Sequence, residues 1–172
     1  MNSAVQQAKK LVNSLRDFQE RREAAQKTWE TLIGELERQA NQVAEEVNRN
    51  GVTRRVNGQS ARVWIERDES EASGKRLKVL FAAAGTEAPS DAKDVATARF
   101  FVDPRTLRVV GDRKPIGAPE AHRGRSGFKR FADLGDILDT TVGAFLDKLL
   151  EFLKWASVGE GSGEHEFRIG SA

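Results

Sequence analysis

The fold is decided by residues 3–48, which read SAVQQAKKLVNSLRDFQERREAAQKTWETLIGELERQANQVAEEVN. This stretch contains no proline and one internal glycine, Gly34, and its apolar residues recur at gaps of three, four and seven. That spacing is the period of an amphipathic helix. The pair Asn50-Gly51 follows, and glycine suits the left-handed residue that commonly ends a helix. We therefore predict one long N-terminal helix, whose apolar residues are Val5, Ala8, Leu11, Leu15, Phe18, Ala25, Trp29, Leu32, Leu36, Val43 and Val47.

The length of this helix has a consequence for assembly. A continuous helix here would be roughly 70 Å long, whereas a compact chain of this size has a radius of gyration of about 16 Å. The helix must therefore protrude, fold back near Gly34, or lie along a partner. Since a small sheet cannot cover the whole stripe of a straight helix, we predict a partner interface at Phe18, Trp29, Leu32 and Leu36. We expect a homo-oligomer, most simply a two-fold dimer through this helix, or docking on another protein.

The composition limits the classes of function. Hydrophobic residues make up 38% of the 172 residues, enough for the core of one domain. The chain has no cysteine, which excludes disulfides, thiolate metal sites and cysteine nucleophiles. Its start lacks the apolar core of a signal peptide and it has no 18-residue apolar span, so we expect a cytoplasmic protein without membrane contact. We expect no cofactor and no metal, because the adjacent residues Glu164, His165 and Glu166 cannot converge on an ion.

After Gly51 the apolar period switches to two, which is typical of strands. Asn57-Gly58 predicts a tight hairpin turn, and a second turn at Asp103–Thr106 predicts that Val102 pairs with Leu107, and Phe100 with Val109. The short connections favour an antiparallel meander. The predicted strands are residues 52–56, 59–67, 75–84, 95–102 and 107–111.

The C-terminal third predicts one further helix. Residues 112–133 are rich in proline and glycine and are interpreted as an irregular connection, and residues 134–156 carry a broad apolar face at helical spacing. We therefore predict an α+β fold: a long N-terminal helix, an antiparallel meander sheet of about five strands, and a C-terminal amphipathic helix packed on one sheet face. The predicted divisions are 1–50 (assembly helix), 51–156 (sheet plus C-terminal helix) and 157–172 (flexible tail).

Strand alternation separates the two faces of this sheet. The core face, which the C-terminal helix would cover, collects Val63, Ile65, Leu77, Val79, Phe81, Phe100, Val102, Leu107 and Val109. The opposite face alternates cations with apolar side chains, and its candidate nucleic-acid-binding residues are Arg55, Arg62, Trp64, Lys78, Arg99, Phe101 and Arg108. Such a face can stack bases and pair phosphates. The alternative is that these stems pack beneath the acidic side of the long helix.

A second basic feature lies between residues 112 and 131. Residues 105–130 hold eight basic and two acidic side chains, and residues 131–172 hold three basic and eight acidic ones. Arginine and glycine interleaved with aromatics are common in nucleic-acid binders, and the alternative is a solvated loop that faces the acidic helix. The candidate binding residues of this loop are Arg113, Lys114, Arg123, Arg125, Lys129 and Arg130.

Motifs of catalytic chemistry are missing from the sequence. Ser73-Gly74-Lys75 lacks the upstream glycine and the following helix of a phosphate-binding loop. An enzyme stays an open alternative, because a site assembled from distant residues leaves no motif. We predict a non-catalytic interaction or assembly subunit that self-associates or docks in a larger complex. The alternative is a protein that binds single-stranded DNA or RNA through the basic sheet face and the loop 112–131.

Overall fold

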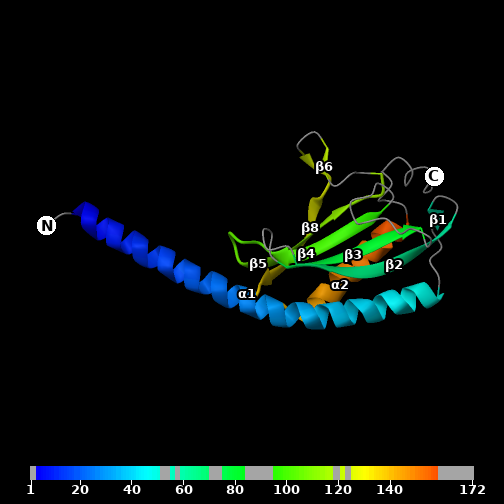
Figure 1. Ribbon diagram of the computed structural model, residues 1–172, viewed down its shortest axis with the longest axis horizontal. Helices are drawn as coiled ribbons and strands as arrows, with labels where there is room; N and C mark the ends of the chain where they lie inside the picture. Colours follow the sequence, from blue (N-terminus) through cyan, green and yellow to red (C-terminus); the bar gives the residue numbers. More distant parts are fainter. Residues whose placement is uncertain are drawn as a thin grey trace.

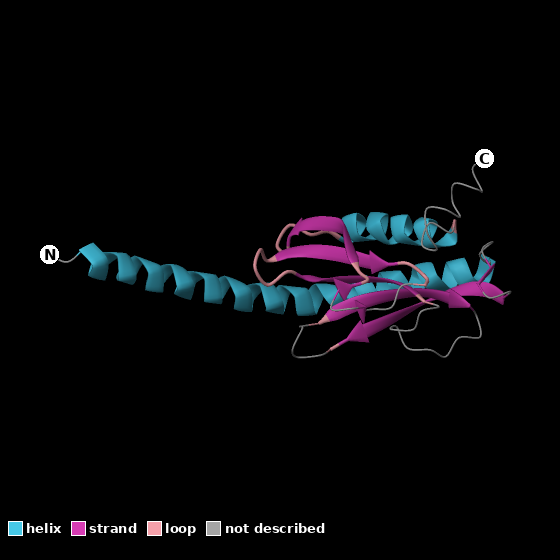
Figure 2. Ribbon diagram, turned by 90° about the horizontal axis from the view of Figure 1, so that it is seen from above, coloured by secondary structure: helices cyan, strands magenta, loops and turns pink. Residues whose placement is uncertain are grey.

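The protein consists of a sheet, two helices packed against it, and a long helical extension. The structure is a computed structural model, which describes residues 3–50, 55–56, 59–69, 75–83, 95–117, 121–122 and 125–158. The first helix, α1 (Ser3–Asn50), is unbroken over 48 residues and runs far beyond the sheet at its N-terminal end (Figures 1 and 2). Gly34 lies inside this helix without interrupting it. The helix therefore does not fold back near Gly34 but protrudes beyond the sheet.

The sheet is antiparallel and has the order β1-β2-β3-β4-β5-β8. The predicted α+β fold with a meander of about five strands is therefore confirmed, with β8 added at the edge beside β5. A short separate hairpin, β6 with β7, lies above the sheet in Figure 1. The strands are β1 (Arg55–Val56), β2 (Gln59–Asp68), β3 (Arg76–Ala83), β4 (Ala96–Val102), β5 (Arg108–Lys114), β6 (Ala121–His122), β7 (Arg125–Ser126) and β8 (Lys129–Asp136).

Both helices pack on one face of this sheet. The buried residues of α1 and of α2 (Val142–Ser157) join the same hydrophobic cluster as Val63, Val79 and Phe100. The α2 side of the core is formed by Phe145, whose ring meets Phe100 edge to face at 4.9 Å between centroids. The predicted core face is thus confirmed, and so is its cover by the C-terminal helix.

The long helix also satisfies backbone groups at one edge of the sheet. The Asn48 side chain donates to the Val63 carbonyl and accepts from the Val63 amide, both at 2.8 Å. These bonds satisfy β2 backbone groups beyond the short strand β1, where an open edge would otherwise remain. The predicted alternative, in which α1 covers the basic face, is wrong. The reason is that the apolar stripe of α1 gains more from the apolar face of the sheet than from the charged one.

The hairpin between β4 and β5 differs from its predicted register by two residues. Val102 pairs with Val109, and Phe100 with Gly111. The turn is longer than predicted because the Leu107 amide donates back to the Asp103 carbonyl at 2.8 Å, with Leu107 in the left-handed region (φ 59°). A shift of two residues keeps every side chain on its predicted face. It also sets a glycine opposite the Phe100 ring, where an added Cβ would come within 2.9 Å of the ring.

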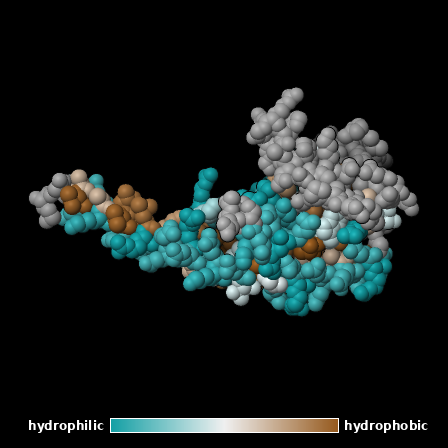
Figure 3. Space-filling model, viewed as in Figure 1, coloured by the Kyte–Doolittle hydropathy of each residue, from teal (hydrophilic) through white to brown (hydrophobic). Residues whose placement is uncertain are grey.

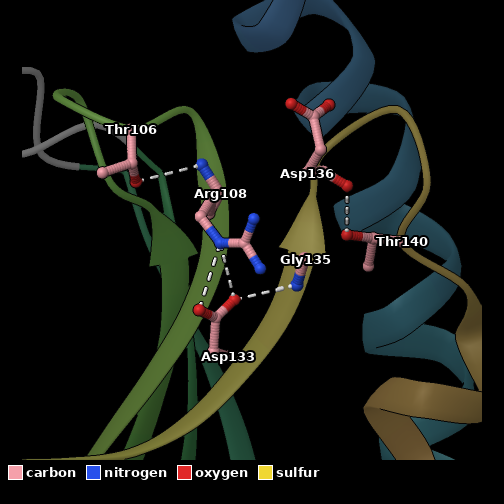
Figure 4. Close-up of polar contacts among 6 residues, drawn as sticks. All are labelled: Thr106, Arg108, Asp133, Gly135, Asp136 and Thr140. Carbon is pink, nitrogen blue, oxygen red and sulfur yellow. Dashed lines mark hydrogen bonds and ion pairs between the residues drawn. The ribbon is translucent and has the colours of Figure 1, made fainter.

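The region before α2 is the main error in the predicted elements. β5 continues to Lys114, residues 129–136 form strand β8, and α2 begins at Val142 rather than at residue 134. Helical spacing alone did not reveal that Thr141 caps the helix, accepting from the Ala144 amide at 3.1 Å. Asp136 holds the turn between strand and helix, because its carbonyl accepts from the Thr140 hydroxyl at 2.9 Å (Figure 4). The predicted Asn57-Gly58 turn lies outside the described residues, although the flanking residues Val56 and Gln59 pair as a two-residue hairpin turn requires.

Candidate interaction surfaces

The first surface is the part of α1 that extends beyond the sheet, residues 3–24, which we call the overhang. Within it Phe18 and Arg22 are partly buried, and every other residue is exposed. Its large apolar side chains remain accessible: the exposed fractions are 49% for Val5, 59% for Leu11 and 59% for Leu15. Figure 3 shows hydrophobic atoms gathered near the free end of this helix. The overhang therefore presents an apolar stripe without a counterpart among the described residues.

This stripe lies on the same side of α1 as the residues that pack on the sheet. Eighteen residues make five helical turns, so side chains eighteen positions apart point in the same direction. Leu11 and Trp29 are eighteen positions apart, and so are Phe18 and Leu36. Trp29 is 3% exposed and Leu36 is fully buried. One continuous apolar face thus runs along the whole helix, and the sheet covers its C-terminal half.

The predicted interface residues divide at the point where the sheet begins. Trp29 and Leu36 belong to the core, and the Trp29 indole donates to the Lys75 carbonyl at 2.9 Å. Phe18 and Leu32 are partly buried against the same core. All four predicted interface residues are less exposed than the apolar residues nearer the N-terminus of α1. The residues that the prediction left out are Val5, Leu11 and Leu15, which the helical period had already marked as apolar, together with Val12, which is also exposed.

The overhang also carries a shallow apolar groove. Its lining residues are Val5, Ala8, Lys9, Val12 and Asn13. The first four stand at positions i, i+3, i+4 and i+7, and four such residues form the hole that receives one side chain of a facing helix. The small side chain of Ala8 leaves the centre of this hole open. The groove can accept a large apolar side chain from another helix.

The second surface is the face of the sheet turned away from both helices, which we call the outer face. Much of its positive charge is neutralised by ion pairs within the sheet. Arg99 contacts Asp112 at 2.6 Å, and both side chains are largely buried. Lys78 lies 3.7 Å from Asp68. By strand register and alternation, the outer face includes Arg62, Trp64, Glu66, Asp68, Arg76, Lys78, Leu80, Ala82, Thr97, Arg99, Phe101, Arg108, Val110, Asp112, Lys114, Arg130 and Asp133.

Arginines surround one aromatic ring on the outer face. The guanidinium carbons of Arg76, Arg99 and Arg130 lie 5.3, 6.0 and 5.9 Å from the centre of the Phe101 ring. Arg99 also stacks on Phe128, at 3.7 Å. These distances are those of cation–π contacts. Sequence reasoning overlooked Arg76, although it lies two residues before Lys78 on the same strand, and alternation places both on one face.

Arg62 and Trp64 form a second cation–π pair on this face, with 4.8 Å between the guanidinium carbon and the ring centre. Trp64 packs against a small cluster that contains Leu80, separate from the main core. The two candidate aromatics, Trp64 and Phe101, are therefore each paired with arginine. This arrangement holds the rings partly accessible beside positive charge.

The predicted basic loop does not form one surface. Arg113 lies on the opposite side of the sheet and stacks on Trp155 at 4.1 Å. Lys114 is fully buried and donates to the Val95 carbonyl at 3.0 Å. Lys129 and Arg130 are exposed at the start of β8. Three further candidates are not placed: Arg123 lies outside the described residues, and only the backbone is described at Arg55 and Arg125.

An exposed ion pair stands at one end of the outer face. Arg108 Nε contacts the Asp133 carboxylate at 3.0 and 3.1 Å, and the Gly135 amide donates to it at 2.9 Å (Figure 4). The hydrogen bond from Arg108, and then that from Gly135, hold the pKa of Asp133 below its ordinary value. On α1, hydrogen bonds from Arg38 and then from Gln39 lower the pKa of Glu35 to about 2.

The described part of the chain shows neither a metal-binding constellation nor a spanning segment. It contains no group of three or more histidine or carboxylate residues placed to hold a metal ion. None of its helices combines the length and the apolar character that crossing a bilayer requires. Comparisons with protein-family models, with curated proteins and with solved structures give no significant match.

Proposed function

We propose that this protein is a non-catalytic assembly subunit, and that the overhang is the element through which it contacts another chain. The observation that carries this proposal is the exposed apolar stripe on residues 3–24. Leu11 and Leu15 are each 59% exposed, on a helix whose equivalent face is fully covered further along the chain. Contiguous exposed apolar surface of this kind marks interaction sites.

The stability of the overhang supports the same proposal. It spans about six turns, and helices in proteins are stabilised mainly by packing of their apolar face rather than by intrinsic propensity. Within residues 3–24 Phe18 is the one hydrophobic residue that packs against the core. A second chain laid along the stripe would supply the missing packing and would remove the apolar side chains from water.

Photo-cross-linking of the full chain in its own cells tests this function. A photoreactive phenylalanine replaces Leu11 on the stripe or, as a matched control, Gln6, which lies on the opposite side of the helix. We expect a cross-linked adduct from position 11 and none from position 6. Equal adducts from both positions, or none from either, would refute docking through the stripe.

A second candidate function is the binding of single-stranded nucleic acid on the outer face. The observation that favours it is the position of Phe101 among Arg76, Arg99 and Arg130 on a face that neither helix covers. An aromatic ring beside guanidinium groups can stack a base and contact its phosphate. Fluorescence anisotropy with a labelled single strand at low salt tests this candidate function. An anisotropy that stays unchanged up to high protein concentration would exclude nucleic-acid binding.

A further inference from the structure

We infer that the outer face holds one internal nucleotide of a single strand at Phe101, with the base on the ring and the two flanking phosphates on Arg76 and Arg130. This inference rests on the second candidate function and adds to it the position of the base, the residues that bind phosphate, and the direction in which the strand crosses the sheet. Three features of the structure lead to it.

The first feature is that the aspartates of the outer face are already engaged by other cations. Each forms an ion pair on the same face, and the pairs are Asp68–Lys78, Asp112–Arg99 and Asp133–Arg108. Within the described part of the chain, no carboxylate lies at ion-pair distance from the guanidinium of Arg76 or of Arg130. Arg76 Nε is buried without a hydrogen-bond partner there, and an unpaired donor on a charged group is costly. Two guanidinium groups thus remain available to an external anion.

The second feature is that these two arginines approach Phe101 from opposite sides. In the order β3-β4-β5-β8, Phe101 stands on β4, Arg76 on the neighbouring strand β3, and Arg130 on β8 beyond β5. Their guanidinium carbons lie 5.3 and 5.9 Å from the centre of the Phe101 ring. An internal nucleotide carries one phosphate on its 5′ side and another on its 3′ side. A base on Phe101 therefore directs one phosphate toward β3 and the other toward β8, so the nucleic acid crosses the β-strands rather than following them.

The third feature is the accessible ring of Phe101. The residue is partly exposed, and none of the described arginines around it lies at stacking distance. Arg99 is stacked on Phe128 at 3.7 Å, whereas its guanidinium carbon is 6.0 Å from the centre of the Phe101 ring. A base can therefore lie on Phe101, and stacking on an aromatic ring is a main contact of proteins that bind single strands. Arg99, held by Asp112 at 2.6 Å, positions the two rings.

Competition on the unaltered full-length protein tests the placement of the phosphates. The probe is a fluorescently labelled oligothymidylate, and its displacement is followed by anisotropy. The competitors are thymidine 3′,5′-bisphosphate, with one phosphate on each side of the nucleoside, and thymidine 5′-diphosphate, with both phosphates on one side. We expect the bisphosphate to displace the probe at about a tenfold lower concentration, because it gains one more charge-assisted contact. Equal potency of the two competitors would overturn the inference.

Two variants test the residues that bind phosphate. Arg76→Ala and Arg130→Ala should each reduce the dependence of log affinity on log salt by about one unit or slightly less. Each should also remove the preference for the bisphosphate, whereas the control Arg49→Ala, at an exposed site of α1, should retain it. Retention of the preference in both outer-face variants would overturn the inference. If Arg76→Ala does not fold, the exposed site of Arg130 and the competition on the unaltered protein still decide.

Failure of the candidate function has a different signature. If the probe anisotropy does not change with the unaltered protein, nucleic-acid binding is excluded and the inference falls with it. If the probe binds but the two competitors are equally potent, nucleic-acid binding stays in place and only the inferred site at Phe101 is removed.

Discussion

Leu15 and Ile33 point to the same side of α1, five turns apart, and one is covered while the other is not. Ile33 is fully buried between the helix and the sheet, whereas 59% of Leu15 is exposed. The two side chains are alike in size and hydrophobicity, so the difference lies in what faces them. The sheet ends before it reaches Leu15, and we propose that another chain covers it.

This pair gives a direct test of the division between core and contact surface. Ile33→Ala should lower the free energy of unfolding by about 2–5 kcal/mol, because it leaves a cavity in the core. Leu15→Ala should leave the unfolding of the monomer nearly unchanged and should weaken the contact with the other chain. Thermal unfolding at low concentration and the photo-cross-linking yield from position 11 measure the two effects. An equal loss of monomer stability in both variants would contradict this division.

A similar pair tests the cover of the sheet by α2. Leu149 is fully buried on α2, and its neighbour Leu150 is 53% exposed. We expect Leu149→Ala to cost about 2–5 kcal/mol, and Leu150→Ala to change stability by less than about 0.5 kcal/mol. Urea unfolding of both variants provides the measurement. Similar midpoints for the two variants would mean that α2 is not held on the core face.

The outer face has its own prediction for nucleic-acid binding. Arg130→Ala should reduce the dependence of affinity on salt by about one unit of slope, because one phosphate contact is lost. Phe101→Ala should instead cost about 1–3 kcal/mol of stacking with little change in slope. Anisotropy titrations at several salt concentrations separate the two effects. Arg49→Ala, on an exposed site of α1, is the control, and an equal loss there would indicate non-specific attraction.

The ion pair between Arg108 and Asp133 predicts a pH dependence. Because the folded state lowers the pKa of Asp133, its stabilisation is present above the unfolded pKa and is lost as pH falls through the folded pKa. Asp133→Asn should therefore cost a fraction of a kcal/mol near neutral pH, since about half of each side chain is exposed. The difference from the parent should shrink below about pH 4. Urea unfolding at both pH values measures it, and a difference that stays constant with pH would contradict the assignment.

The elements that depend on local periodicity were predictable from the sequence. The 3.6-residue period identified α1 to within two residues of its end, and alternation assigned Val63, Val79 and Phe100 to the core face. Alternation survives an error in register, as the two-residue shift at Leu107 shows. Periodicity did not predict the start of α2. The apolar residues of 134–156 follow helical spacing throughout, although the turn at Asp136 and the cap at Thr141 separate strand β8 from the helix.

The sequence by itself thus determined the order of helix, meander and helix, and marked an apolar stripe along all of α1. Only the tertiary structure decided which part of that stripe is core and which part is exposed. The physical reason is that Leu11 and Trp29, or Leu15 and Ile33, are equivalent in helical period, and local pattern cannot show how far a sheet extends. The same holds for the outer face, since the ion pair of Arg99 with Asp112 and the burial of Lys114 arise from strands that meet only in the folded chain.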